Sequence, residues 1–242
     1  MNSLLQVERL HKSFRGLRAV AEVSFNVQQG AIVALIGPNG AGKTTLFNMI
    51  AGALAPDSGA IRFDGARIDG LRPDQICARG IGRTFQIVKP FAGLSVLDNV
   101  VVGALQRDAN VNDARRSAAE ILDKVGLSAK RELPATTLTL PDQKLLEIAR
   151  ALATRPRLLL LDEALAGLRP AEYDRLIALF HELHRSDGIT ILLVEHVMRA
   201  VMALAQEIIV LHHGEILARG LPDCVVKEPA VLECYLGEDV EP

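Results

Sequence analysis

Hydrophobic and polar positions follow two patterns in the first third of the chain. Short segments rich in β-branched and aromatic residues predict strands at 4–10, 19–27 and 60–63. The apolar run AIVALIG, at 31–37, predicts a buried strand, and the helical spacing of TTLFNMIAG, at 44–52, predicts a helix directly after it. The expected local order is therefore strand, glycine-rich loop and helix.

The middle of the chain, from about 88 to 152, has helical periodicity and few β-branched runs. The segment DARRSAAEILDKVG is typical of it, and Gly126 at its end is expected to terminate the helix. Pro73 favours a further helix start just before this region. We therefore expect a helical subdomain at about 88–152.

Strand and helix patterns alternate again in the last third. An apolar strand at 157–163, a helix at 171–185, a strand at 188–196 and a helix at 197–205 are expected in turn. This alternation predicts a parallel sheet covered by helices. Two strands around a His213-Gly214 turn and a short helical tail at about 221–242 complete a single α/β domain spanning 1–242.

Composition narrows the class of protein. With 242 residues, 49% hydrophobic and 23% charged, the chain is expected to be globular and soluble. A net charge of -2, 4% aromatic residues and no Trp argue against nucleic acid as a partner. No apolar run is long enough for a signal peptide or a membrane span, so the chain is expected to stay in the cytoplasm. The three cysteines have no metal-type spacing and are expected to be free thiols.

The segment GPNGAGKT matches the phosphate-binding pattern G-x-x-x-x-G-K-[ST], between a predicted strand and a predicted helix. Its backbone N–H groups and the helix dipole are suited to phosphate. Lys43 is expected to reach the β- and γ-phosphates of ATP, Thr44 to bind Mg²⁺, and Thr45 to contact another phosphate oxygen. The residues expected to bind nucleotide in this segment are Gly37, Pro38, Asn39, Gly40, Ala41, Gly42, Lys43, Thr44 and Thr45.

Polar residues end two of the predicted buried strands. Asp162 and Glu163 follow four leucines, and His196 ends the next strand. Ligands bind at the carboxyl ends of parallel strands, where buried carboxylates are otherwise costly. We expect Asp162 to hold Mg²⁺ through water, Glu163 to polarise the attacking water, and His196 to contact the γ-phosphate.

Together these motifs resemble the nucleotide-binding subunits of ATP-binding-cassette (ABC) transporters over almost the whole chain. The resemblance implies a RecA-like P-loop NTPase core, an antiparallel β subdomain and an inserted helical subdomain. It also implies that Phe14, in HKSFRG, stacks on adenine. Gln86, in RTFQ, would sense Mg²⁺ and the attacking water and begin a segment, including Pro90 and Phe91, that faces the membrane subunit.

Three stretches narrow the resemblance within that superfamily. RTFQIVKPFAGLSVLDNVVVGAL, the VEH-M run at 194–198 and the tail ending ECYLGE are similar to the larger of two ATPase types in bacterial branched-chain or hydrophobic amino acid importers. The implied partners are transmembrane permease subunits, a second ATPase subunit and, indirectly, a solute-binding protein. The implied location is the cytoplasmic face of the inner membrane. Alternatives are a lipopolysaccharide-export ATPase, another ATPase of the superfamily, and a nucleotide-dependent scaffold with little hydrolysis.

One motif of this chain departs from the family pattern. In the family, a Leu-Ser-Gly-Gly-Gln signature contacts the partner subunit's nucleotide, and it aligns here with LTLPD at 138–142. Thr139 keeps a hydroxyl for nucleotide and is also suited to cap the following helix. Pro141 lacks an N–H, Leu140 removes a glycine, and Asp142 is expected to place a carboxylate where phosphate arrives.

Two interpretations of this departure stay open. In the first, the ATPase pair is asymmetric, and the altered signature, together with Arg169 in the loop after Glu163, gives a slower or regulatory site. In the second, the hydroxyl and the helix dipole suffice, and the variant is tolerated. His212 and His213 are expected to be exposed residues at a strand end, without a metal role.

Overall fold

The computed structural model describes residues 3–85 and 89–236. Its N-terminal sheet has the strand order β2-β1-β4-β5. The strands are β1 (Ser3–Phe14), β2 (Leu17–Gln28), β4 (Ser58–Phe63) and β5 (Ala66–Arg67), and they pair antiparallel. β1 and β2 extend beyond their predicted bounds because their backbones pair with each other as far as Phe14 and Leu17. This backbone pairing does not depend on which face of the sheet the side chains occupy. The expected antiparallel β region is confirmed.

The second sheet has six strands in the order β10-β9-β3-β8-β7-β6. They are β3 (Ile32–Ile36), β6 (Ile81–Arg83), β7 (Leu158–Asp162), β8 (Thr190–Val194), β9 (Glu207–His212) and β10 (Glu215–Gly220). All neighbours pair parallel except β9 and β10, which form a hairpin. The predicted parallel sheet is confirmed, and β6 is a strand that the hydrophobic pattern did not predict.

Alternate residues of the central strands feed two separate hydrophobic cores. On β3, Val33 and Leu35 face a core built with α1 (Lys43–Ile50) and the N-terminal sheet, whereas Ile32, Ala34 and Ile36 face the core on the helix-rich side. Successive strand side chains point to opposite faces, so a strand apolar at every position must be covered twice. The six-stranded sheet is therefore buried on both faces, by α1 and the N-terminal sheet on one side and by the helix-rich core on the other.

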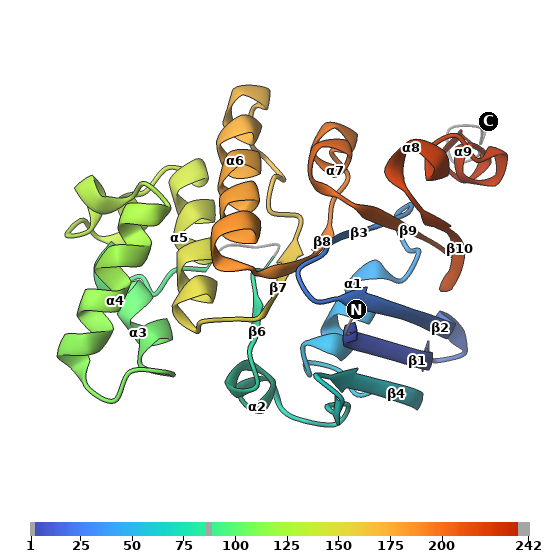
Figure 1. Ribbon diagram of the computed structural model, residues 1–242, viewed down its shortest axis with the longest axis horizontal. Coiled ribbons are helices and arrows are strands. Elements are labelled where there is room, and N and C mark those ends of the chain that lie inside the picture. Colours follow the sequence, from blue (N-terminus) through green and yellow to red (C-terminus); the bar gives the residue numbers. More distant parts are fainter. Residues whose placement is uncertain (1–2, 86–88, 237–242) are drawn as a thin grey trace.

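The remaining helices lie beside the six-stranded sheet and at one end of the molecule (Figure 1). Helices α3 (Val96–Ala104), α4 (Val111–Lys124) and α5 (Leu140–Ala153) gather at the end of the molecule away from the N-terminal sheet. Gly126, at φ 73°, follows α4, where the N–H groups of Gly126 and Leu127 donate to the carbonyls of Asp123 and Leu122, as predicted for a helix end. The other helical elements are α2 (Pro73–Ala78), α6 (Pro170–Asp187), α7 (Met198–Leu204), α8 (Pro222–Val225), α9 (Pro229–Leu236), η1 (Ser128–Lys130) and η2 (Ala135–Thr137).

Among residues 3–85 and 89–236, no helix is both long and apolar enough to cross a membrane. Cys77, Cys224 and Cys234 are free thiols, as expected.

Candidate active site

The phosphate loop joins β3 to α1 through backbone conformations that require glycine. Gly37 has φ 146°, and a Cβ there would lie 2.0 Å from the carbonyl oxygen of Leu211. Gly42 has φ 103°, and its Cβ would lie 2.2 Å from the carbonyl oxygen of Ala19. Positive φ and close backbone neighbours exclude a side chain at both positions. The loop is therefore packed closely against the backbones of β9 and β2.

Lys43 occupies the interior of this loop. Its side chain is buried, and Nζ donates hydrogen bonds to the carbonyl oxygens of Gly37 at 2.6 Å and Pro38 at 2.7 Å. These contacts satisfy the ammonium, which would otherwise be costly to bury. The ammonium that the sequence predicts to bind phosphate therefore lies within the loop itself.

A cleft of about 470 Å³ opens beside the loop. Ten of the predicted site residues line it, namely Phe14, Asn39, Gly40, Ala41, Gly42, Lys43, Thr44, Thr45, Glu163 and His196. Four further lining residues were not predicted to belong to the site, namely Leu17, Arg18, Ala19 and His213. Phe14 is 45% exposed, and Nζ of Lys12 lies 5.7 Å from the centroid of its ring. Phosphate-loop, strand-end and aromatic groups therefore share one cavity.

His213 is one of the residues that the sequence interpretation missed. It lies in the β9–β10 turn, at φ 47°, and Gly214 after it donates its N–H to the carbonyl of Ala41 at 3.0 Å. The N–H of Ala21 in turn donates to the carbonyl of Gly214 at 2.8 Å. These bonds fasten the turn to the phosphate loop and to β2. The side chain is exposed as expected, but its place at the cleft depends on contacts distant in sequence.

Asp162 ends β7 as a buried carboxylate with a cationic partner. Its Oδ2 accepts a hydrogen bond from Nη2 of Arg83 at 2.9 Å, and the side chains are only 3% and 11% exposed. Nη1 of Arg83 donates to Asn48 on α1 at 2.7 Å. Arg83 carries no motif signal and was not predicted, although it connects the predicted metal ligand to the helix that follows the phosphate loop.

Glu163 and His196 are brought together from the ends of β7 and β8. Nε2 of His196 lies 3.0 Å from Oε1 of Glu163. The side chains are 17% exposed for Glu163 and 41% exposed for His196, and both line the cleft. A carboxylate and an imidazole in contact at a phosphate cleft are suited to orienting water and accepting its proton.

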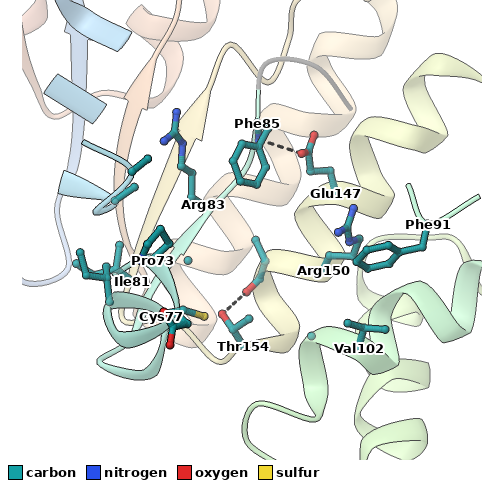
Figure 2. A pocket seen from close by; sticks show the side chains of 17 residues that line it. Pro73, Cys77, Ile81, Arg83, Phe85, Phe91, Val102, Glu147, Arg150 and Thr154 are labelled. Atoms are coloured by element: carbon teal, nitrogen blue, oxygen red, sulfur yellow. Dashed lines mark hydrogen bonds between the residues drawn. The ribbon is translucent and has the colours of Figure 1, made fainter. Parts of the chain in front are cut away.

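A second, more apolar groove of about 370 Å³ lies between α2, β6, α3 and α5 (Figure 2). Oε1 of Glu147 accepts the backbone N–H of Phe85 at 2.9 Å, and the guanidinium of Arg150 lies 4.5 Å from the ring centroid of Phe91. Burial raises the pKa of Glu147 to about 6, although the Phe85 N–H and nearby cations oppose the rise. Phe85 is 57% exposed and Phe91 is 43% exposed. Gln86 lies outside the described residues.

The structure corrects two expectations for the segment 138–142. Thr139 precedes α5, but its hydroxyl donates to Oδ2 of Asp142 at 2.7 Å and accepts no backbone N–H as a cap. The carboxylate of Asp142 is buried and forms an ion pair with Lys130, so it does not project toward an incoming phosphate. Burial raises the pKa of Asp142, but hydrogen bonds from Lys130 and Thr139 outweigh it and keep the pKa below its ordinary value.

The exposed part of this segment is Leu140, with 43% of its surface accessible. It lies beside the loop after Glu163, where a Cβ on Gly167 would be 3.1 Å from its Cδ2. In the same loop the side chain of Arg169 is 84% exposed and pairs with Glu172 at 2.8 Å. Both unusual features of the sequence thus lie on neighbouring surface segments, and neither lines the cleft beside the phosphate loop.

Comparison with known proteins assigns this chain to a protein family. The ABC transporter family matches residues 20–166. The chain belongs to the ABC transporter family. It is an ATP-binding cassette of the ATP-hydrolysing type, with a P-loop NTPase fold. The family resemblance drawn from the sequence is confirmed.

Two curated relatives carry transport names. The high-affinity branched-chain amino acid transport ATP-binding protein BraF of Pseudomonas aeruginosa is 40% identical over 97% of this chain and 98% of its own length. The lipopolysaccharide export system ATP-binding protein LptB of Acidithiobacillus ferridurans is 34% identical over 100% of both chains.

Solved structures are similar throughout the cassette. The ADP conformation of an ATP-binding cassette of an ABC transporter has a TM-score of 0.89 at 31% identity, covering 98% of this chain and 100% of that one. A dimeric post-hydrolysis cassette bound to ADP and Pi has a TM-score of 0.82 at 25% identity, covering 90% of this chain and 98% of that one.

Proposed function

We propose that this chain is the ATP-hydrolysing subunit of an importer for branched-chain or other hydrophobic amino acids or related amides. It would lie at the cytoplasmic face of the inner membrane, attached to permease subunits. A solute-binding protein would deliver the solute to those permease subunits. The observation that carries the ATPase role is the cleft that joins Lys43, Thr44, Glu163 and His196. The transport role rests on the similarity to BraF and to LivG of Escherichia coli, which is 39% identical over 97% of the chain.

The roles of the cleft residues follow from their chemistry. The loop from Gly37 to Thr45 would hold the phosphates of ATP, with Lys43 turning its ammonium from the loop carbonyls to the β- and γ-phosphates. Phe14 would stack on adenine. Glu163 would orient a water molecule and accept its proton as the water oxygen attacks the γ-phosphorus and the bond to the β-phosphate oxygen breaks. His196, 3.0 Å from Glu163, would contact the γ-phosphate.

The chain also has a donor set that fits Mg²⁺. Thr44 and Asp162 line one cavity, and hydroxyl and carboxylate oxygens are the ligand types that this ion prefers. Asp162 would hold the ion through water, and Gln86 would be a further ligand. Bound Mg²⁺ would neutralise phosphate charge during hydrolysis. Arg83 would keep the buried Asp162 carboxylate paired and fixed in direction.

The groove between α2 and α5 is where we place the permease. Its lining is mostly apolar, and the exposed Phe85 and Phe91 lie beside it on the segment that contains Gln86. Nη1 of Arg150 also donates to the carbonyl of Lys89 at 3.0 Å, so both sides of this segment are anchored to α5. A permease element docked in this groove would contact Phe85 and Phe91, on the segment that also contains Gln86. Gln86 is the residue that we propose contacts Mg²⁺ at the hydrolysis site.

We further propose that two ATPase subunits close around ATP. Thr139 would contact the nucleotide of the second subunit, and the dimeric cassette among the solved structures supports such pairing. Because Asp142 is paired internally, an impaired site would have to result from Leu140, Pro141 and Arg169. Both a heterodimer with one slower site and a homodimer with a tolerated signature remain compatible with this surface.

Light scattering distinguishes these two assemblies. Glu163→Gln should prevent hydrolysis while keeping ATP bound, which stabilises a closed dimer. An ATP-dependent homodimer would show that the segment 138–142 closes on nucleotide. A monomer that binds ATP by calorimetry would show that closure needs a partner with a different signature.

Hydrolysis itself is tested on the purified chain. Release of phosphate from Mg·ATP should be measurable and should disappear in Glu163→Gln, with ATP affinity retained. Hydrolysis equal to wild type in that variant would refute the assigned role, and an absence of turnover in the wild-type protein, both alone and with its permease, would favour a scaffold. Uptake of labelled leucine by vesicles with the cognate permease separates import from lipopolysaccharide export, the second candidate suggested by LptB.

A further inference from the structure

Glu163 has a backbone conformation that costs energy. Its φ is 49°, in the left-handed region, which residues other than glycine seldom adopt. The backbone N–H of Glu163 donates to the carbonyl of Val194 on β8 at 2.9 Å. Its carbonyl accepts the N–H of Ala166 at 3.1 Å. The direction in which the carboxylate leaves the chain therefore depends on contacts that hold this residue in place.

Lys144 provides one such contact from α5. The residue is only 4% exposed, and Nζ donates to the carbonyl oxygen of Glu163 at 3.1 Å. Burying an ammonium without acceptors is costly, so the Glu163 carbonyl helps to hold this side chain in place. Lys144 lies two positions after Asp142, on the first turns of the helix that begins with the signature segment.

Glu195 provides another contact from the end of β8. It is also 4% exposed, and Oε1 accepts the backbone N–H of Leu165 at 2.9 Å. Leu165 is two residues beyond Glu163, and Glu195 immediately precedes His196. The carboxylate thus connects the loop after Glu163 to the strand end that carries the histidine. Two buried polar side chains, an amine on α5 and a carboxyl at the end of β8, hold the same short loop.

We propose that Lys144 and Glu195 are positioning residues for hydrolysis, which hold Glu163 in its left-handed conformation and connect its loop to the signature helix α5 and to His196. This inference rests on the proposed ATPase function. Lys144 belongs to the helix whose first turn faces a partner's nucleotide, whereas Glu163 acts on the nucleotide of its own subunit. A shift of α5 on closure would then change the position of Glu163, so one ATP site would influence the other.

The test measures ATP affinity and turnover separately. Lys144→Met keeps the length of the side chain and removes the donor. We expect a loss of about 10²-fold in kcat, the size of effect that displacement of a catalytic group by about 1 Å can produce, with ATP affinity within about twofold of wild type. Lys144→Arg should recover a large part of the rate because it restores a donor. The matched control Lys124→Met removes a lysine on α4 that pairs with Asp187 and should leave kcat unchanged.

Glu195 offers an independent pair of variants. Glu195→Gln keeps a carbonyl acceptor for Leu165 and should keep most of the rate, whereas Glu195→Leu should lower kcat in the same way as Lys144→Met. Thermal denaturation and ATP calorimetry establish that each variant is folded. Hydrogen exchange at residues 163–168 should rise in Lys144→Met and Glu195→Leu, but not in Lys124→Met.

Three outcomes would overturn the inference. The first is a folded Lys144→Met protein with wild-type kcat, and the second is equal losses in ATP affinity and kcat. The third is an unfolded Lys144→Met together with a folded Glu195→Leu of wild-type rate. Loss of turnover in Glu163→Gln, measured beside these variants, verifies the ATPase role separately. Failure of the inference therefore differs from failure of the proposed function.

Discussion

The burial of Glu195 predicts an unusual dependence of stability on pH. Burial raises the pKa of this carboxyl from 4.5 to about 7, and nearby Glu163 adds to the rise, while N–H groups of Leu165 and His196 and the charge of Lys144 oppose it. Between these two pKa values the folded protein holds a proton that the unfolded chain releases. The free energy of unfolding therefore falls as pH rises through this window.

The size of the effect follows from the shift. Each pKa unit corresponds to about 1.4 kcal/mol, so Glu195 would remove about 3 kcal/mol of stability between its unfolded and folded pKa values. Glu195→Gln keeps a carbonyl acceptor for Leu165 and cannot ionise. The variant should therefore have a stability similar to that of wild type near pH 4.5 and become more stable than wild type, by up to about 3 kcal/mol, near pH 8.

Urea unfolding followed by circular dichroism, at several pH values across this window, measures the difference directly. Glu182→Gln, at an exposed position on α6, is the matched control and should follow the wild-type curve. A difference between wild type and Glu195→Gln that stays constant within about 0.5 kcal/mol across the window would refute the reasoning. That result would mean that Glu195 is charged and adequately solvated or paired in the folded protein.

Three other substitutions test the cleft. Gly37→Ala should destabilise the protein by roughly 2 to 3 kcal/mol, because its Cβ would lie 2.0 Å from the carbonyl of Leu211; an unchanged melting temperature would contradict this. Arg83→Met should cost about 3 to 5 kcal/mol in chemical denaturation by leaving Asp162 buried and unpaired, with partial recovery on adding Asp162→Asn; the reasoning fails if the single change is neutral. Phe14→Ala should weaken ATP binding about 10-fold by removing a stacking face, without changing the affinity for free triphosphate, and calorimetry with both ligands decides.

Local sequence determined the parts of this protein whose residues are neighbours along the chain. The phosphate loop is one continuous segment, so its glycines, Lys43 and Thr44 identify the strand, the turn and the helix together. The four leucines before Asp162 likewise specify a fully buried strand, because strand periodicity is a property of consecutive residues. The family, the fold class and most of the cleft lining were predictable for this reason.

Only the tertiary structure decided contacts between segments far apart in sequence. β6 has three residues and is a strand because β7 pairs with it, and His213 reaches the cleft because Gly214 bonds to the phosphate loop. Asp142 was expected to face a phosphate, but its buried carboxylate forms an ion pair with Lys130 instead.

The support of Glu163 by Lys144 and Glu195 has the same origin. Periodicity and motifs record which side of an element is buried, but they do not specify which groups meet there. That pairing is fixed when elements pack and each buried charge must find a partner.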